Sequence, residues 1–397
     1  MSLLNLNKAI KKALSNIAPL DIQNVSLLEA NNRVLSNNLK ALKSHPPYDN
    51  SSMDGYAISF ESIKKTPIKI EVIGEAPAGH PFLKKVPKDK AVRIFTGGII
   101  PNGTDTVVIQ ENVIVSGKYI IIKNTEKKFQ HIRKKGLDFK KGQVLLNKGQ
   151  LLKPKDIALA ASMNHTSLPV YKKPKIAVIS TGDEIVLPGS KDAEYKIITS
   201  NSYGILSYIK NLGGEGIDCG IAKDTIESIK DKLTLAKDAD IIVTLGGASV
   251  GDYDLIQKSL KDDLKIGFWK IAMRPGKPLI YGTMNKSKFL GLPGNPVSSM
   301  VCSQLFLKPM IEKFLGLKNK NEYPKILHAE LGQDLPKNDI REDYIRAKLN
   351  NNIVHPFEKQ DSSMLANFQR SNVYIIRPPH AKSIKKGNQV PILFIDL

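Results

Sequence analysis

The sequence has few cysteines, few aromatic residues and no long apolar run, and each absence excludes a class of protein. Only two of its 397 residues are cysteine, Cys219 and Cys302, and their separation excludes a disulfide scaffold and a cysteine-based zinc module. No window approaches the roughly 18 consecutive apolar residues of a membrane helix. Residues 1–14 alternate lysine with leucine and isoleucine, which is typical of an amphipathic helix and not of a signal peptide. We therefore expect a cytoplasmic protein with no membrane partner.

Arginine is also scarce, although the chain is strongly basic. The formal net charge is +21, yet only eight of the 59 basic residues are arginine, and the lysines are spread along the whole chain. Proteins that bind nucleic acids usually cluster their basic residues and add stacking aromatics, but aromatic residues here make up 6%. We therefore expect no nucleic-acid partner. A lysine-rich surface still favours anionic small ligands.

Along the N-terminal half, the predicted secondary structure changes twice, from helix to short strands and then to turns with one helix. A length of 397 residues predicts two to four domains. Residues 1–40 have helical spacing of apolar positions, with a second such stretch at 25–34, before the break at His45-Pro46-Pro47. Short β-rich runs separated by glycine and proline then fill about 50–140 and predict a small β domain. Turns and one short helix, 154–162, follow.

From residue 175 the chain alternates short apolar strands with amphipathic helices. This alternation predicts a parallel sheet that is covered on both faces by helices. Beyond about residue 319, short strands with proline and glycine between them predict a β-barrel or sandwich. The strands expected in the α/β region are 175–180, 217–222, 239–245, 268–273, 279–281 and 289–292, and the helices are 200–212, 225–237, 253–260 and 296–314.

Four loops that follow strands of the α/β region carry unusual residues. They are TGDE (181–184), GGASVGDYD (246–254), RPGKP (274–278) and PGNPVSS (293–299). Ligands of such sheets bind outside the carboxyl ends of the strands, so these loops predict a ligand site. Glycines allow a close approach of the backbone, and Arg274 and Lys277 match phosphate-like oxygens.

The carboxylates in these loops leave two roles open. Asp183, Glu184, Asp252 and Asp254 either hold a hard cation such as Mg²⁺ or bind polar groups of a nucleotide. The region has neither a GxxxxGK[ST] sequence nor a GxGxxG sequence after its first strand, which counts against P-loop hydrolysis and dinucleotide-dependent dehydrogenation. In the β domain, SSMDGYA (51–57) is either a turn or a ligand-facing carboxylate with hydroxyls.

Six segments, in this order along the chain, resemble the molybdopterin molybdenumtransferases, that is, the MoeA family and the gephyrin E-domain. The resemblance covers nearly the whole chain, and the MDGYA motif is close to diagnostic. The α/β loops alone are shared with the smaller MogA-like molybdopterin adenylyltransferases. The segments are SSMDGYA (51–57), RIFTGG (93–98), STGDE (180–184), GGASVGDYD (246–254), FWKIAMRPGKP (268–278) and GLPGNPVSS (291–299).

The resemblance implies a multidomain α/β fold with four domains. A MogA-like doubly wound α/β domain, which binds molybdopterin, would span 172–318, and a C-terminal β-barrel would span 319–397. An elongated, discontinuous linker domain would consist of 1–44 and 141–171, with a β domain inserted at 45–140. The resemblance also implies a homodimer in which the β domain of one subunit faces the α/β cleft of the other.

The activity that the resemblance implies is the insertion of molybdate into adenylylated molybdopterin, which releases AMP and forms the molybdenum cofactor. Mg²⁺ is the expected ion, and a MogA-like adenylyltransferase is a possible partner. The alternative is that the α/β domain itself adenylylates molybdopterin.

The family's functional positions carry over residue by residue. Asp54 and Thr96 would be contributed by the partner subunit, and Glu184 and Asp254 would be metal ligands. The catalytic positions are Asp54, Thr96, Glu184, Asp224 and Asp254. The substrate-binding positions are Asp138, Gly246, Gly247, Ser249, Lys270, Arg274, Lys277, Pro278, Ser298, Arg341 and Ser362.

Three positions depart from the family's pattern. Leu245 replaces the serine often found before the two glycines, and Ala248 stands where valine is common; both bear on loop packing. Arg274 stands where lysine is common, which keeps the charge and adds a second hydrogen-bonding arm.

Overall fold

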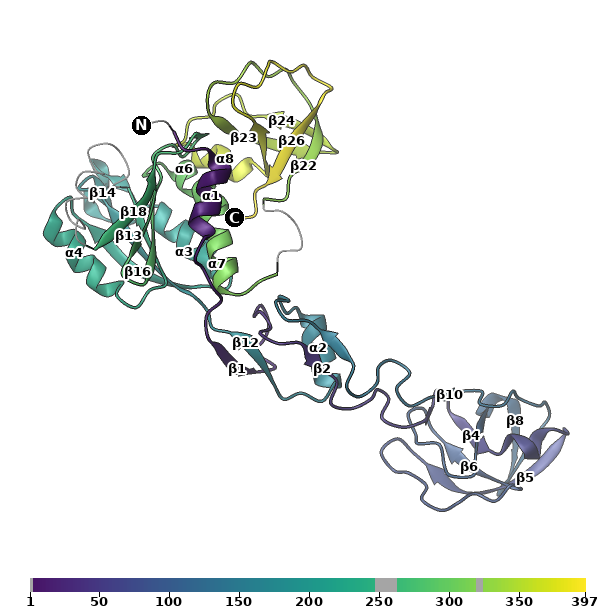
Figure 1. Ribbon diagram of the computed structural model, residues 1–397. Helices are drawn as coiled ribbons and strands as arrows, with labels where there is room; N and C mark the ends of the chain where they lie inside the picture. Colours follow the sequence, from purple (N-terminus) through teal and green to yellow (C-terminus); the bar gives the residue numbers. More distant parts are fainter. Residues whose placement is uncertain (1–2, 247–262, 319–323) are drawn as a thin grey trace.

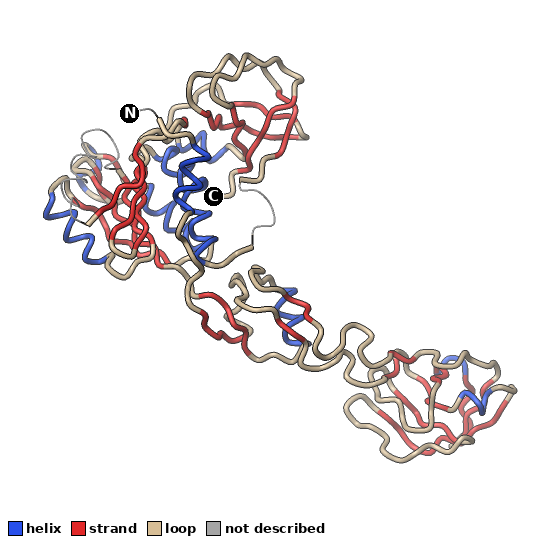
Figure 2. Tube along the Cα trace, in the orientation of Figure 1, coloured by secondary structure: helices blue, strands red, loops and turns tan. Residues whose placement is uncertain are grey.

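The molecule is elongated, with two bodies joined by a narrow neck (Figure 1). A computed structural model describes residues 3–246, 263–318 and 324–397. The C-terminal body holds an α/β layer and a barrel, and the β body at the other end holds a separate sheet. Figure 2 shows that helices gather in the C-terminal body, whereas the β body is mostly strand and loop. Within the described residues, no helix is long and apolar enough to cross a membrane.

The neck is built from antiparallel pairs between the outgoing and the returning chain. β1 (Ile22–Ser26) pairs with β12 (Ser167–Tyr171), and β2 (Leu39–Lys40) pairs with β11 (Val144–Leu146). The helical expectation for 25–34 is wrong. β1, which exposes and half-buries alternate residues, ends at Ser26, and turns follow it up to an isolated bridge at Val34.

The neck also contains the predicted short helix. α2 (Pro154–Ser162) begins and ends as expected, with proline in its first turn. The Asp156 carboxylate accepts the Lys153 N–H at 2.8 Å. Leu35, Leu152 and Met163 belong to a core that is the neck's own.

The β body contains a six-stranded sheet in the order β7-β4-β6-β5-β9-β8. A short pair, β3 (Asn50–Ser51) with β10 (Ile132–Arg133), joins it to the neck. The β-rich prediction for this region is confirmed. The strands are β4 (Gly55–Ile58), β5 (Ile68–Ala76), β6 (Lys90–Ile94), β7 (Thr106–Ile109), β8 (Val113–Ser116) and β9 (Tyr119–Ile122).

The sheet of the α/β layer has the order β16-β13-β17-β21-β20-β18. The expectation of a fully parallel sheet is corrected, because β20 runs against both of its neighbours. A two-residue turn, in which Asn285 has φ +52°, joins β20 to β21, and so short a connection can link only antiparallel strands. The strands are β13 (Lys175–Thr181), β16 (Glu215–Ala222), β17 (Ile241–Leu245), β18 (Leu264–Trp269), β20 (Ile280–Met284) and β21 (Ser287–Leu292).

Helices cover both faces of this sheet, as predicted. On one face Ala177 and Ile179 pack with α4 (Ile226–Leu235), and on the other Ile176 and Val178 pack with α3 (Asn201–Asn211). The helix expected at 296–314 is present and contains one π-helical turn. It consists of α6 (Pro296–Cys302), the π turn Ser303–Leu307 and α7 (Lys308–Phe314). The helix expected at 253–260 lies outside the described residues.

Helix α1 (Leu6–Leu14) also belongs to this packing. It lies in residues 1–44, which the sequence assigns to the elongated domain, yet Leu6 and Ile10 bury themselves against the α/β layer beside Phe268 and Phe306. The domain boundaries themselves remain predictions.

The C-terminal strands close into a barrel, which confirms that expectation. β23 pairs with both β24 and β25, and the ring continues through β22 and β26. A short strand of the α/β region, β19 (Met273–Arg274), adds to it alongside β23. The barrel strands are β22 (Leu327–Leu331), β23 (Glu342–Asn350), β24 (Ile353–Pro356), β25 (Val373–Arg377) and β26 (Gln389–Phe394), and α8 (Leu365–Arg370) precedes β25.

Candidate functional site

A cleft of about 500 Å³ opens at the carboxyl ends of the α/β strands. The first strand, β13, has the second on one side and the third on the other, so the strand order reverses between β13 and β17. Ligands of open α/β sheets bind at such a switch point. The walls of the cleft include Gly182, Glu184, Asp224, Gly246 and Gly294. The expectation that the strand-end loops meet at one edge is therefore confirmed for these residues.

Two glycines in the cleft have a positive φ, and one of them also approaches the backbone of a neighbouring loop closely. Gly246 has φ +96°, and a Cβ added there would lie 2.8 Å from the Thr181 carbonyl oxygen. Gly182 has φ +139°, and its added Cβ would lie 2.6 Å from Oε2 of Glu184. The loops after β13 and β17 thus pack backbone against backbone, and the Glu184 carboxylate folds over a residue that has no side chain.

Exposed carboxylates gather on one side of the cleft. The Asp183 N–H donates to Oδ2 of Asp224 at 3.4 Å, and the Asp224 N–H donates to Oδ1 of Asp183 at 3.3 Å. These reciprocal bonds hold the loop after β13 to the loop after β16. Glu184 and Asp224 face the cleft, and their oxygens are donors of the type that Mg²⁺ prefers. Among residues 3–246, 263–318 and 324–397, no cluster of three metal-ligating side chains is present.

The wall of the cleft also contains a residue that the sequence did not single out. Asn201, at the start of α3, donates its Nδ2 to the Gly294 carbonyl at 2.7 Å, while its Oδ1 is buried without a hydrogen-bond partner. β14 (Ile185–Val186) and β15 (Ile197–Ile198) pair beside it and add apolar side chains to the cleft. No motif in the sequence marks Asn201, which lies at the beginning of the predicted helix 200–212.

The RPGKP loop reaches the cleft with only part of its length. Pro278 lines the cleft and Lys277 is exposed next to it. Lys270 lies before the loop, with its Nζ 3.7 Å from the centroid of the Trp269 ring. Arg274 lies among barrel residues, where its Nε donates to Oδ1 of Asp343 at 2.8 Å.

The barrel also approaches the cleft. The Val297 N–H donates to the Ser362 carbonyl at 3.0 Å, which places Ser362 beside the buried Ser298. Ser363, which the sequence reasoning missed, lines the cleft. Arg341 donates to Asp339 at 2.8 Å and so belongs with the partners of Arg274.

Asp54 and Thr96 are brought together, but in the β body and not in the cleft. The Thr96 N–H and the Thr96 hydroxyl each donate to Oδ1 of Asp54 at 2.8 Å, and these bonds lower the pKa of Asp54. In a single chain this pair and Glu184 lie in separate bodies (Figure 1). Asp138 is exposed in the connection between the β body and the neck, where its N–H donates to the His45 carbonyl at 3.0 Å.

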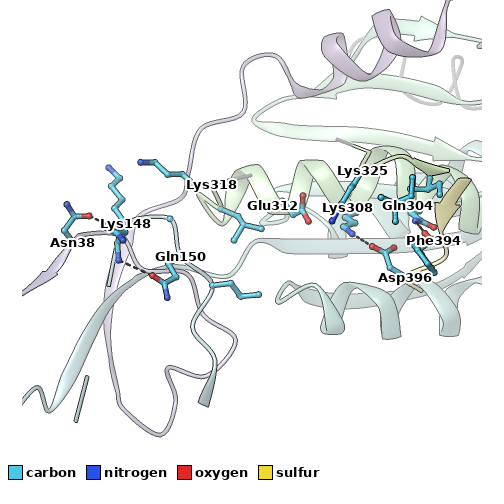
Figure 3. A pocket seen from close by; sticks show the side chains of 16 residues that line it. Asn38, Lys148, Gln150, Gln304, Lys308, Glu312, Lys318, Lys325, Phe394 and Asp396 are labelled. Atoms are coloured by element: carbon cyan, nitrogen blue, oxygen red, sulfur yellow. Dashed lines mark hydrogen bonds and ion pairs between the residues drawn. The ribbon is translucent and has the colours of Figure 1, made fainter. Parts of the chain in front are cut away.

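A larger cavity of about 1010 Å³ lies between the neck, α7 and the barrel. Figure 3 shows that its labelled residues come from both sides of this junction. Lys308 pairs with Asp396, and Asn38 accepts the Lys148 N–H at 2.8 Å. This cavity lies away from the strand ends, so the smaller cleft is the better candidate site.

Comparison with known proteins agrees with this geometry. Models of the MoeA N-terminal region (domains I and II), a probable molybdopterin binding domain and the MoeA C-terminal region (domain IV) match residues 4–164, 177–313 and 328–395. The molybdopterin molybdenumtransferase of Haemophilus influenzae is 33% identical, with 98% of each chain covered. That of Nostoc is also 33% identical, over 94% of this chain and 88% of the relative.

Solved structures give the same result. Two structures of a molybdopterin biosynthesis MoeA protein from Pyrococcus horikoshii have TM-scores of 0.88 and 0.83 at 29% and 30% identity, covering 100% and 99% of this chain and 100% of theirs. The chain belongs to the MoeA family of molybdopterin molybdenumtransferases.

Three positions carried over from the MoeA family, Gly247, Ser249 and Asp254, lie outside the described residues. The roles of the other positions remain predictions, although their locations are known. In this chain, the cleft at the switch point brings together Glu184, Asp224, Gly246 and Pro278. Asp54 and Thr96 form a second group in the β body.

Proposed function

We propose that this protein joins molybdate to adenylylated molybdopterin, cleaving the pyrophosphate bond and releasing AMP and the molybdenum cofactor. The observation that carries the proposal is the cleft at the switch point, where glycine backbone and the carboxylates of Glu184 and Asp224 meet in a chain that matches full-length molybdopterin molybdenumtransferases. In the cytoplasm, a MogA-like adenylyltransferase would supply the adenylylated substrate.

The active unit in this proposal is a homodimer. Asp54 lies in the β body, and its carboxylate is held by Thr96 in an ionised state that suits a site for cations or hydrogen-bond donors. Asp54 directly precedes β4, whereas the cleft lies at the ends of β13 and β17 in the other body (Figure 1), and this separation supports a site that the β body of a second copy completes.

The residues of the cleft divide the work between binding and orientation. Glycine N–H groups and the exposed Lys277 would hold the phosphate and molybdate oxygens. Glu184 of the cleft, together with Asp254 outside the described residues, would hold Mg²⁺, which when bound would neutralise charge on the pyrophosphate. No side chain in the wall is placed as an obvious covalent nucleophile among the described residues, so positioning and electrostatics would supply most of the rate.

The test is molybdate-dependent release of AMP from adenylylated molybdopterin by the purified protein. Glu184→Gln and Asp54→Asn should each lower that release while leaving the fold intact by circular dichroism. Glu215→Gln, at the exposed start of β16, is a control for the loss of one carboxylate and should keep the activity.

Full activity in both purified variants would refute the assignment of these roles. ATP consumption with free molybdopterin, without AMP release on addition of molybdate, would identify the adenylyltransferase activity in its place.

A further inference from the structure

The RPGKP loop joins two sheets. After β18 the chain leaves the α/β sheet, and Met273 and Arg274 pair in parallel with Glu342 and Asp343 of the barrel strand β23. The chain then returns to the α/β sheet as β20. The position of the loop at the cleft therefore depends in part on its attachment to the barrel.

The guanidinium of Arg274 adds a side-chain contact to this backbone pairing. Its Nε and one terminal nitrogen bind both carboxylate oxygens of Asp343, and the other terminal nitrogen binds Oδ2 of Asp339 at 3.3 Å. Arg341 donates to the same oxygen of Asp339 at 2.8 Å. The Asp343 side chain is only 8% exposed, whereas the Arg274 side chain is 47% exposed, so the carboxylate of the bidentate pair is buried and the guanidinium is half-exposed.

Lys277, three residues further on, has a different environment. Its side chain is exposed and makes no ion pair with any residue in the described part of the chain. The next residue, Pro278, lines the cleft. The loop thus carries one cation that barrel carboxylates bind and one that no carboxylate of residues 3–246, 263–318 and 324–397 binds.

We infer that Arg274 is a positioning residue, which fastens the RPGKP loop to Asp343 and so holds Lys277 and Pro278 at the cleft. This inference rests on the proposed function, and it departs from the expectation that Arg274 itself binds phosphate or molybdate oxygens.

The energetics of the pair favour this role. For Arg274 to bind an oxyanion with both arms, it would have to leave Asp343, whose carboxylate would then be buried without its cation. Burial raises the pKa of Asp343, and the hydrogen bond from Arg274 partly opposes that rise. The same bond raises the pKa of Arg274.

A double-mutant cycle in the full-length protein tests the inference. Arg274→Ala and Asp343→Asn should each lower kcat for molybdate-dependent AMP release about tenfold, because each releases the loop. The double variant should be no worse than either single variant, because both remove the same attachment. The KM for molybdate should change less than kcat in all three.

Direct binding by Arg274 gives the opposite pattern. Arg274→Ala would then raise the KM for molybdate strongly, whereas Asp343→Asn would free the guanidinium and keep or lower the KM. Arg274→Lys separates the two roles as well: a positioning role needs the two-armed bond and loses kcat, whereas binding of an anion is largely preserved by the lysine charge.

Hydrogen exchange of the segment 271–279 tests the attachment without substrate. Arg274→Ala and Asp343→Asn should speed exchange there to a similar extent, and the milder Asp339→Asn supplies the same measurement if Asp343→Asn does not fold. Unchanged exchange in every variant would overturn the inference. A wild-type protein that releases no AMP would instead defeat the proposed function, and the exchange result would still decide the role of Arg274.

Discussion

The two bodies of the molecule differ in how their cores are shared. The α/β layer, helix α1 and the barrel are held by one apolar cluster, in which Leu6 and Phe268 belong with Tyr344 and Tyr374 of the barrel. The β body has two small clusters of its own, around Ile120 and Val107, with no member from the C-terminal body.

This difference indicates how the candidate site is divided. The residues of the cleft and the barrel residues beside them belong to one packed unit, because a shared close-packed core transmits displacement. The Asp54–Thr96 pair is ordered within a unit that packs separately. In the proposed dimeric site, each group would therefore be organised before the two copies meet.

The largest expected effect comes from a cavity in each core. Ile311→Ala in the shared core and Ile120→Ala in the β body should each cost about 2–5 kcal/mol of local stability. The single tryptophan, Trp269, lies in β18, so its fluorescence reports the C-terminal body alone. Ile311→Ala should shift the denaturation midpoint of that signal, and Ile120→Ala should leave it unchanged. Equal shifts would mean that the two bodies unfold together.

The next effect concerns assembly of the two halves. Glu184→Gln and Asp54→Asn should each reduce activity on the order of 100-fold, because each neutralises a charge in a preorganised site. When the two variants are co-expressed, half of the dimers contain one intact site, and activity should return to about one quarter of wild type. A mixture as inactive as its components would show that both groups act within one chain.

A smaller effect on stability distinguishes the cost of an unfavourable backbone conformation from the cost of a steric clash with a neighbouring backbone. Gly79→Ala in the β body, at φ +81° with open space around it, should cost about 1 kcal/mol. Gly246→Ala adds a contact of 2.8 Å with the Thr181 carbonyl, so its cost should reach about 2–3 kcal/mol, and substrate turnover should fall with it. Urea denaturation measures both, and equal costs would contradict the packing of backbone against backbone in the cleft.

The smallest effect is a dependence on pH in the β body. Hydrogen bonds from Lys118 and Lys90 hold the pKa of Glu71 at about 2. Because the pKa of Glu71 is lower in the folded than in the unfolded protein, its ionised carboxylate stabilises the fold at every pH above the pKa of the unfolded state. This contribution disappears as the pH falls towards about 2. Hydrogen exchange of the β body should therefore show wild type more protected than Glu71→Gln at pH 6 and equal to it near pH 2. The Trp269 signal should not distinguish the two proteins.

Much of the fold could be predicted because its signals are local. Apolar runs located the central strands of the α/β layer, and the rule for strand ends brought Glu184, Asp224 and Gly246 together correctly. The run around Val25 was misread as helical, because five residues of a half-exposed ribbon carry no distinctive period. β20 runs antiparallel to β21 because a two-residue turn at Asn285 joins them, and no sequence motif predicts this turn.

The rest of the site depends on pairings between distant segments. Nothing near Arg274 in the sequence indicates that carboxylates almost 70 residues further along the chain bind its guanidinium. Asn201 is recognisable only once its amide is seen against the Gly294 carbonyl. Sequence motifs identify which residues have useful chemistry, but tertiary contacts determine which of them are free to use it.

The pairing of the two strands of the neck has a consequence for folding during synthesis. Ile22 pairs with Tyr171 and Lys40 pairs with Val144, so residues roughly 100 to 150 positions apart are neighbours in the neck. The entropic cost of closing such loops grows only slowly with their length, so a long insert between the arms is tolerated. During synthesis, β1 and β2 therefore cannot form their pairs until β11 and β12 have left the ribosome. For the same reason, the insert between the arms is a natural place to exchange one module for another without disturbing these pairs.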